Sequence, residues 1–530
     1  MLLLPNFYSS LASWMLVLLA LASVSARVSA APTERPNVVV IYTDDQGYGD
    51  VAYLNPQAKF ATPNFDRLAA EGLCFTDAHC SDTVCTPSRY GLLTGRYSWR
   101  TPLKKGVMGA EGECLIADGR MTLASLLRDA GYHTGMVGKW HLGMDFPGEP
   151  ASRDWSQPVV DMPLDKGFDY FFGVPASLNY GVLAWFEGRH ARVPPILYTN
   201  KKPNDRHSDY RIQPPYQHTS EETQEALGTR GMEVAADFVD SQCLTRFTDE
   251  AIAWMRKQSS GGQAEQPFFL YLPYTSPHYP VCPLPQFHGQ GAAGGYGEFV
   301  IETDYHVGRI LQFLEQSGLD RNTLIVVTSD NGPENSWTQR VKEFDHRSNG
   351  IYRDGKRAIY EGGHRVPFLV RWPAGIEQPG RQIAQPICQT DLLATLAEML
   401  GRDLPEAAGE DSHSFYAALK NAHAASPRPP IIHHAANGRF AIRDGNWKLV
   451  MAHGRAPREL YDLQRDPSEQ QDVVDNQPEV VERLTRQLTD VVLRGRSTAG
   501  GAQANDTGHW SDLTWIRPQD FPKPVGAEAE

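Results

Sequence analysis

The stretch Asn37-Val-Val-Val-Ile-Tyr42 is a short run of β-branched and aromatic residues, and two acidic residues, Asp44 and Asp45, follow it. A run of this length and composition predicts a strand that is buried on both faces. Similar runs occur further along the chain, separated by stretches in which apolar residues recur at helical spacing. This alternation predicts an α/β fold in which a large, mostly parallel sheet lies between helices. The other predicted strands are 133–137, 268–272, 324–328 and 368–371, and the predicted helices are 64–71, 123–131, 300–314 and 391–400.

Polar side chains follow four of these strands at the point where each strand ends. Asp44 and Asp45 follow the first strand, and Asp330 and Asn331 follow a later one. Since ligands of parallel α/β sheets gather outside the carboxyl ends of the strands, we expect these side chains at one edge. Each pair alone could serve only to cap a turn, but both together form an oxygen ligand set that selects Ca²⁺ or Mg²⁺ over zinc. The basic residues expected at the same edge are Lys139, His141 and His278.

The composition restricts the class of partner. The 530 residues include 50 Lys and Arg against 63 Asp and Glu, a formal net charge of −13. Nucleic-acid binding depends largely on Lys and Arg contacts with phosphates, so a nucleic-acid partner is not expected. A negative chain does not attract an anionic substrate over long range, and any anion site must therefore be a local basic pocket.

The first residues carry an apolar run, 11–22, followed by small-residue sites that end at Ala26 and at Ala30. This pattern predicts a signal peptide over residues 1–30, cleaved after Ala26 or Ala30, and hence an exported protein. An uncleaved membrane anchor is the alternative, and the absence of Lys and Arg before residue 11 departs from the signal-peptide pattern. No other stretch approaches the roughly 18 apolar residues that a membrane helix needs, so stable membrane insertion is not expected.

The pattern changes along the rest of the chain. Residues 145–240 lack regular periodicity and are predicted to form long loops over the sheet. A proline-containing linker at 424–430 precedes a predicted hairpin around Asp444-Gly445. We therefore expect a large domain over residues 31–425, a small antiparallel subdomain over residues 426–500 and a loosely ordered tail over residues 501–530.

Cys85 is the cysteine, among seven, whose surroundings carry a motif. Cys85-Thr86-Pro87-Ser88-Arg89 lies where a loop enters a predicted short helix, and Thr94-Gly95-Arg96 follows. A cysteine phosphatase would need an arginine at the position that Gly91 occupies, so that chemistry is excluded. No Cys-x-x-Cys pair occurs, which argues against a thiolate zinc site, and the other six cysteines could be paired or reduced.

The motif around Cys85 resembles the signature of the type I sulfatases, an arylsulfatase-like family of the alkaline phosphatase superfamily whose cysteine is oxidised to Cα-formylglycine. Further motifs occur in the family's order over about residues 35–475. The resemblance implies an alkaline-phosphatase-like large mixed sheet between helices, with residues 31–425 as the catalytic domain. The matching motifs are Asp44-Asp45-Gln-Gly, Gly138-Lys-Trp-His-Leu-Gly143, Gly167-Phe-Asp-Tyr, Ser276-Pro-His, Ser329-Asp-Asn-Gly332, Glu361-Gly-Gly-His-Arg-Val-Pro367 and Leu460-Tyr-Asp-Leu463.

The resemblance also implies roles for single residues. It places one Ca²⁺ ion between Asp44, Asp45, Asp330 and Asn331, in contact with the modified Cys85. Hydrated formylglycine would attack sulfur through one hydroxyl group and expel sulfate through the other. It further implies that Arg89 braces the nucleophile and the carboxylates and that Lys139 contacts sulfate. His278 and Lys356 would protonate or stabilise the leaving alcohol. His141 would accept the final proton.

The implied activity is that of a sulfuric ester hydrolase acting on a small-molecule or oligosaccharide sulfate ester, either a sulfated carbohydrate or an aryl sulfate. The loops of residues 145–240 would cap the pocket, and their aromatic residues together with Arg189 and Arg192 would suit a sulfated sugar. Maturation would need a formylglycine-generating enzyme or its equivalent as a partner. The protein would be periplasmic or extracellular, or lysosomal in a eukaryote.

Two alternatives remain at this point. A phosphonate or phosphate ester hydrolase of the same superfamily could share the motifs, since some such relatives use the same formylglycine. A sulfated-glycan-binding pseudo-enzyme, in which Cys85 is never converted, is the alternative from another class. The filled catalytic positions argue against it, because a binding protein does not require them.

Overall fold

The computed structural model describes residues 35–150, 152–199, 232–260, 266–421 and 428–522. The predicted signal peptide, residues 1–30, lies outside these residues. From Pro36 onward the described chain forms one compact unit. Within the described ranges, every helix is too short or too polar to span a lipid bilayer.

Ten strands of the described chain form one mixed sheet, with β1 (Asn37–Asp44) near its middle. β1 pairs in parallel with β12 (Thr323–Ser329) on one side and with β11 (Phe268–Pro277) on the other. Their β-branched and aromatic side chains are buried, as the continuous apolar runs predict. The predicted α/β fold with a large mixed sheet is confirmed. The strand order is β14 (Arg381–Ile383), β2 (Leu73–Phe75), β13 (Phe368–Arg371), β12, β1, β11, β4 (His133–Lys139), β5 (Tyr170–Val174), β7 (Phe186–Glu187) and β8 (His190–Ala191).

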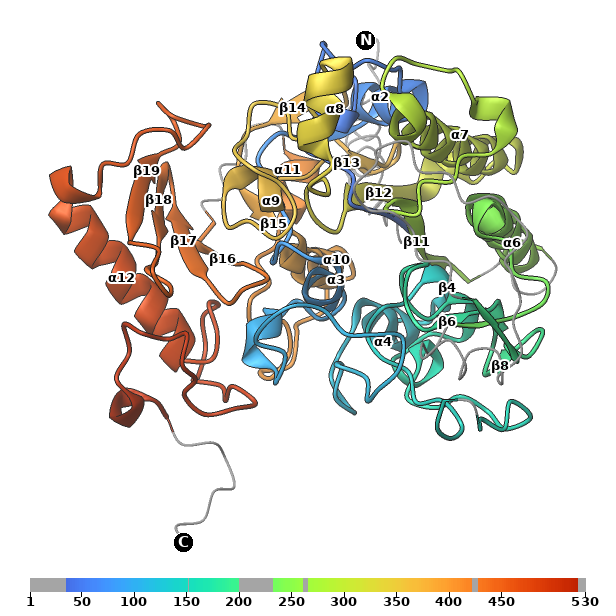
Figure 1. The fold of residues 1–530 in the computed structure, drawn as a ribbon, viewed down its shortest axis with the longest axis horizontal. Helices are drawn as coiled ribbons and strands as arrows, with labels where there is room; N and C mark the ends of the chain where they lie inside the picture. The colour runs from blue at the N-terminus through green and yellow to red at the C-terminus, as the bar shows by residue number, and fades with distance from the viewer. Residues whose placement is uncertain (1–34, 151, 200–231, 261–265, 422–427, 523–530) are drawn as a thin grey trace, which may run out of the picture. The chain divides into compact units, whose positions relative to one another are not determined.

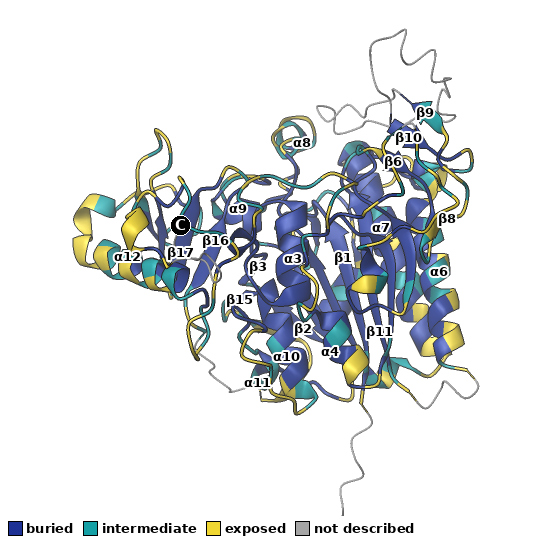
Figure 2. Cartoon of the chain, turned by 90° about the horizontal axis from the view of Figure 1, so that it is seen from below, coloured by how far each residue is buried: buried dark blue, intermediate teal, exposed yellow. Residues whose placement is uncertain are grey.

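Helices cover both faces of this sheet (Figure 1). In one layer, α7 (Gly294–Gln316) contacts both α2 (Pro63–Glu71) and α6 (Cys243–Gln258). α3 (Cys85–Thr94) packs with α4 (Leu123–Asp129) and α10 (Leu392–Met399) in the other layer. Every residue of α3 is buried, whereas α6 exposes its outer side (Figure 2). A helix that is buried all round can place reactive groups inside the molecule, away from bulk water.

A second, smaller sheet follows in the last quarter of the chain. Four antiparallel strands of the described residues form it, and α12 (Pro478–Leu493) packs against it. The hairpin that was predicted around Asp444-Gly445 is confirmed. The division of the chain at residues 425 and 426 stays a prediction. The strands are β16 (Ile431–His434), β17 (Phe440–Asp444), β18 (Trp447–Val450) and β19 (Glu459–Asp462).

The prediction of loops alone over residues 145–240 is wrong for part of this segment. β5 extends the large sheet because its backbone pairs with β4 and its Phe171 and Phe172 are buried. A further three-stranded sheet lies in the described part of the same segment. Its strands are β6 (Val182–Leu183), β9 (Leu197–Thr199) and β10 (Met232–Val234).

Further short elements lie elsewhere in the described chain. They are β3 (Ala78–His79), β15 (Ile387–Cys388), α8 (Trp337–Phe344), α9 (Glu361–His364) and α11 (Tyr416–Lys420).

The loosely ordered tail over residues 501–530 stays a prediction, and its described residues up to 522 make contacts with the rest of the chain. Asp506 accepts a hydrogen bond from Arg96, with Nη2 and Oδ1 2.8 Å apart. Asn505 accepts one from Arg100 at 3.0 Å, and Leu513 is fully buried in the core of the small sheet.

The close approach of β4 and β5 rests on two glycines, Gly138 and Gly173, which pair across the strands. A Cβ atom at Gly173 would lie 1.8 Å from the carbonyl oxygen of Gly138. We expect Gly173→Ala to lower the free energy of unfolding by about 1–3 kcal/mol, because the strands must separate. Urea unfolding measures this effect. Gly181→Ala is the matched control, since nothing lies within 4 Å of its Cβ position; equal stability of the two variants would contradict the prediction.

Candidate active site

The acidic residues that follow β1 and β12 meet at the carboxyl edge of the large sheet. Asp44, Asp45, Asp330 and Asn331 are all buried. The backbone N–H of Asp45 donates to Asp330 Oδ1 at 3.1 Å, and Asn331 Nδ2 donates to Asp45 Oδ1 at 2.7 Å. Asp45 has a positive φ of 64°, an uncommon conformation for a residue with a side chain. The four residues therefore lie together at this edge, as the sequence predicts.

Cys85 is the first residue of α3 and carries a free thiol. Its Sγ lies 3.6 Å from Asp44 Oδ1, and its residue is only 2% exposed. Burial raises the pKa of the Cys85 thiol well above its ordinary value. The genetically encoded thiol is therefore protonated near pH 7 and is a poor nucleophile.

Each carboxylate contacts a basic side chain. Lys139, at the end of β4, donates to Asp44 Oδ2 at 2.5 Å. Arg89, one helical turn after Cys85, donates to Asp330 Oδ2 at 2.8 Å. A third ion pair joins Lys356 Nζ to Asp45 Oδ1 at 2.6 Å.

These pairs set the charge states of the buried acids. Burial would raise the pKa of the Asp45 carboxyl, but the Lys356 ammonium holds it below its ordinary value. Burial and the neighbouring Asp44 carboxylate raise the pKa of Asp330. For Lys356, the attraction of Asp45 outweighs burial and holds the pKa well above its ordinary range. The buried charges are thus compensated one by one.

Two histidines, His141 and His278, complete the group. His141 Nε2 lies 2.9 Å from the carbonyl oxygen of Met108 and donates to it, so the bare nitrogen is Nδ1, which has no partner among the described residues. His278 Nδ1 donates to the carbonyl oxygen of Tyr279, which leaves Nε2 bare, 3.8 Å from Asp45 Oδ2. Burial lowers the pKa of His278 to about 3 and that of His141 well below its ordinary value. Both rings are therefore neutral, and each has one ring nitrogen without a hydrogen.

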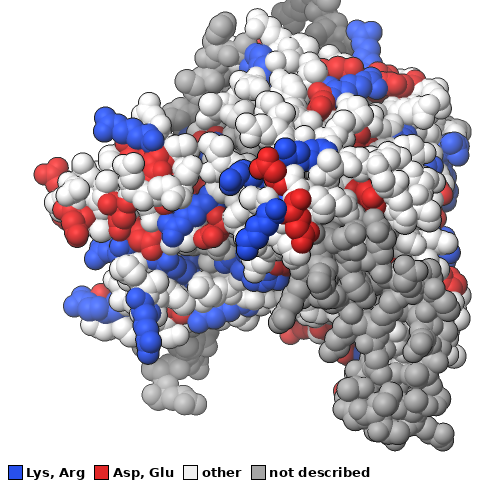
Figure 3. All heavy atoms as spheres, turned by 45° about the horizontal axis from the view of Figure 1, so that its top comes forward, with Lys and Arg blue, Asp and Glu red and all other residues white. Residues whose placement is uncertain are grey.

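A cavity of about 130 Å³ opens onto this group. Cys85, His141, His278 and Lys356 line it, whereas the three carboxylates lie beneath them. Exposed Lys and Arg side chains are interspersed with Asp and Glu on the face shown in Figure 3. The other residues that line the cavity are Val84, Gly106, Val107, Tyr180, Tyr279, Arg357 and Ala436.

Several of the residues that line the cavity belong to no motif or periodic pattern from which the sequence could have predicted them. Tyr279 and Arg357 lie in irregular segments, and Arg357 has a positive φ of 76° and pairs with Glu334. Of the aromatic residues in the segment 145–240, Tyr180 lines the cavity, while Trp185 is fully buried in the core. Arg189 and Arg192, which were expected to suit a sulfated sugar, pair instead with Asp165 and Glu187.

The donor set fits a hard cation. Asp44, Asp45, Asp330 and Asn331 offer oxygen atoms, and the buried Oδ1 of Asn331 has no partner among the described residues. Three carboxylates and an amide oxygen are ligands that Ca²⁺ and Mg²⁺ accept. Asp44, Asp45, Cys85 and His278 also have ligand atoms within 4.8 Å of one another.

Known proteins are similar to this chain in sequence and in fold. The family model described as Sulfatase matches residues 36–402, and the model described as N-sulphoglucosamine sulphohydrolase, C-terminal, matches residues 350–494. The chain is 33% identical to the N-acetylgalactosamine-6-O-sulfatase of Bacteroides thetaiotaomicron, over 87% of this chain and 94% of that protein. It is 31% identical to human arylsulfatase A, over 92% of this chain and 93% of that protein.

Solved structures agree with these relatives. One solved structure, from work on the metabolism of multiple glycosaminoglycans by Bacteroides thetaiotaomicron, has a TM-score of 0.73 and is 31% identical to this chain. The match covers 87% of this chain and 99% of the chain in that structure. The phosphonate monoester hydrolase of Agrobacterium radiobacter, at 19% identity and a TM-score of 0.55, shares the fold. The family match spans well over half of the chain, and the chain therefore belongs to the sulfatase family of the alkaline phosphatase superfamily and is a sulfuric ester hydrolase.

Proposed function

We propose that the protein removes sulfate from a sulfated carbohydrate, using a Cα-formylglycine formed from Cys85 and a bound Ca²⁺ ion. The observation that carries this proposal is the position of Cys85, at the start of a buried helix, 3.6 Å from Asp44 and at the wall of a cavity that Lys356 and two neutral histidines also line. The protonated thiol argues that the unmodified cysteine is not the nucleophile.

Asp44, Asp45, Asp330 and Asn331 would hold the cation. Ca²⁺ takes six to eight oxygen ligands in flexible geometry, whereas Mg²⁺ keeps several waters. A buried group that supplies several protein oxygens therefore favours Ca²⁺. The cation would place positive charge on the sulfate oxygens, and the aldehyde at position 85, once hydrated, would supply the attacking oxygen.

The basic residues would bind the substrate once the carboxylates face the cation. Lys356 lines the cavity, and once Asp45 faces the cation its ammonium group can donate to a sulfate oxygen. Lys139 does not line the cavity, so its contact with sulfate would require that the cation also draws Asp44 away from its ammonium group. Arg89 does not line the cavity and instead holds Asp330, so we assign it a positioning role.

The two histidines would handle protons at opposite ends of the reaction. His141 Nδ1 is bare and lines the cavity beside Cys85, which suits a base that takes a proton from the nucleophile. His278 and Lys356 both lie next to Asp45. An anionic ester in the cavity raises the pKa of His278, so this ring and the Lys356 ammonium can donate to the leaving oxygen.

The size and the walls of the cavity support the proposed substrate class. A space of about 130 Å³ accommodates a sulfate and the atoms next to it, and no length of polymer. Tyr180 and Tyr279 form part of its wall, and aromatic rings commonly pack against sugar faces. Together with the identity to an N-acetylgalactosamine-6-O-sulfatase, this supports a sulfated sugar at a chain end.

Two finer points belong to the same proposal. We infer that a formylglycine-generating enzyme or its equivalent acts on the chain during maturation. We also infer that the protein is exported to the periplasm or the extracellular space, or to the lysosome in a eukaryote. The signal-peptide pattern of residues 1–30 supports this location.

The nucleophile is tested by the mass of the tryptic peptide that contains Cys85. Conversion of a thiol to an aldehyde should lower the mass by roughly 18 Da, because one oxygen replaces sulfur and two hydrogens. Cys85→Ala should lower kcat by at least about 10³-fold, since the attacking group is lost. Cys114→Ala, at another buried cysteine that does not line the cavity, should retain activity. Turnover by protein that is fully unconverted would refute the mechanism.

Asn331 tests the cation site. We expect Asn331→Ala to weaken Ca²⁺ binding by about 10-fold or more, because it removes an oxygen ligand. Isothermal titration of chelator-treated protein measures this affinity. Asn446→Ala, at a surface asparagine that bonds Gln464, is the control. Unchanged Ca²⁺ affinity in the Asn331 variant would remove this residue from the ligand set.

A substitution of Tyr180 tests whether the substrate is a sulfated sugar. Tyr180→Ala should lower kcat/KM for a sulfated N-acetylhexosamine by about 2- to 12-fold, the equivalent of about 0.5–1.5 kcal/mol of ring packing. The effect on a small aryl sulfate should be smaller, because that ester fills less of the wall. Tyr305→Ala, at a tyrosine that is 46% exposed and absent from the cavity, is the control. A larger loss on the aryl ester would favour an aryl sulfate as the natural substrate.

A further inference from the structure

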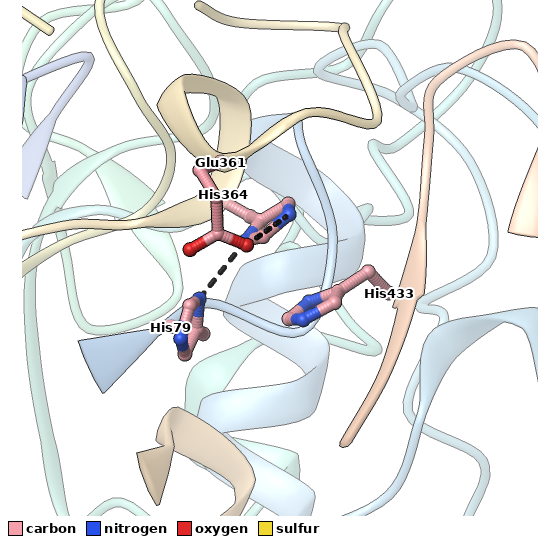
Figure 4. A group of neighbouring side chains, drawn as sticks. All are labelled: His79, Glu361, His364 and His433. Atoms are coloured by element: carbon pink, nitrogen blue, oxygen red, sulfur yellow. Dashed lines mark hydrogen bonds and ion pairs between the residues drawn. The ribbon is translucent and has the colours of Figure 1, made fainter. Parts of the chain in front are cut away.

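A second group of buried side chains lies apart from the residues that line the cavity. His79 ends β3, Glu361 and His364 belong to α9, and His433 belongs to β16 of the small sheet. All four are fully buried, and their ligand atoms lie within 4.8 Å of one another. Figure 4 shows the carboxylate of Glu361 beside the rings of His79 and His364, with His433 next to them. We call these four residues the histidine cluster.

The outer nitrogens of two of these rings have hydrogen-bond acceptors. His79 Nε2 donates to Asp77 Oδ1 at 2.7 Å, which leaves Nδ1 facing His364. His364 Nε2 lies 3.2 Å from the carbonyl oxygen of Ile359. The inner nitrogens, Nδ1 of His79 and Nδ1 of His364, are 3.0 Å apart. Histidines that bind metals usually donate their other N–H to a carboxylate or a backbone carbonyl in this way.

His433 is the residue of the histidine cluster whose burial is not compensated by hydrogen bonds. Neither of its ring nitrogens has a partner among the described residues, although the side chain is fully buried. The ring stacks on His364 with their centroids 3.7 Å apart. Burying a polar group without a partner is unfavourable, so a ligand for this nitrogen is the expected complement.

We propose that the histidine cluster binds a divalent transition-metal ion, with Zn²⁺ as the first candidate. The ligands would be Nδ1 of His79, Nδ1 of His364, one ring nitrogen of His433 and a carboxylate oxygen of Glu361. Because an ion lies in the plane of each ring that binds it, the His433 ring would turn out of its stack on His364 when it binds. Three imidazoles and one carboxylate suit Zn²⁺, whereas Ca²⁺ prefers oxygen ligands throughout. Four protein ligands with no open position are typical of a structural site.

A metal-free network competes with this proposal. Lys448 Nζ lies 2.9 Å from His364 Nε2, 3.1 Å from Glu361 Oε1 and 2.8 Å from Glu469 Oε1. Without an ion, His364 would accept from Lys448 at Nε2 and donate from Nδ1 to His79. With an ion, the His364 proton moves to Nε2 and faces the Ile359 carbonyl, and Lys448 keeps its two carboxylates. Only the second arrangement gives His433 a partner.

The ion would join separate parts of the chain. β3 and α9 supply three ligands, and β16 of the small sheet supplies the fourth. α9 begins five residues after Lys356, and the carbonyl oxygen of its Gly363 accepts from the N–H of Gly332, next to Asn331. A metal here would therefore fix the segment that leads to the cavity without touching the cavity itself.

The test is a titration of chelator-treated full-length protein with Zn²⁺ and with Co²⁺, after saturation with Ca²⁺ to occupy the oxygen site. We expect one equivalent of Zn²⁺ per chain, and a Co²⁺ form with the visible absorption of four-coordinate cobalt and no thiolate charge-transfer band. His433→Phe keeps a stacked ring but removes the nitrogens, and it should bind Zn²⁺ at least about 100-fold more weakly. His190→Phe, at an exposed histidine of β8, should bind as the unsubstituted protein does.

Three results would overturn the proposal. No stoichiometric Zn²⁺ binding to the Ca²⁺-saturated protein would assign the histidine cluster to the metal-free network through Lys448. Full binding by the His433→Phe variant would place the ion elsewhere. A thiolate charge-transfer band would identify a cysteine as a ligand. The first and third results come from the unsubstituted protein, so they do not depend on the folding of a variant.

Discussion

Three carboxylates lie side by side where β1 and β12 end, and the surrounding structure compensates their charge. Charged groups that leave water are stable only when each is paired and hydrogen-bonded. The partners come from β4, from α3 and from the segment after β12, so the ion pairs hold these elements at the sheet edge. The pairs are Lys139 with Asp44, Arg89 with Asp330 and Lys356 with Asp45.

The same ion pairs connect folding with chemistry. In the metal-free molecule the basic residues neutralise the acids. If a divalent cation takes over that task, as proposed, the site acquires excess positive charge inside a region of low dielectric constant. A sulfate monoester would then replace the carboxylate as the partner of Lys356, and Lys139 would add positive charge close to it. A chain with a net charge of −13 can in this way bind an anion at one buried place.

The sequence predicts those parts of the molecule that depend on local pattern. The runs that form β1 and β12 are continuous and apolar, and the acids that follow them meet because parallel strands end at one edge. β5 was missed because Phe171 and Phe172 show no alternation and become a strand through pairing with β4. The walls of the cavity and the neighbours of His433 in the histidine cluster come from positions far apart in the chain, and no spacing rule links them.

The burial of Cys85 has a consequence for how active protein is obtained. An enzyme that oxidises this residue needs access to it, and α3 encloses it once the chain has folded. If Cys85 is converted as proposed, conversion would compete in time with folding, and the specific activity of a preparation would report the ratio of two rates. A variant that folds faster would yield more native protein and a smaller active fraction, and unfolding and refolding unconverted protein would not restore it.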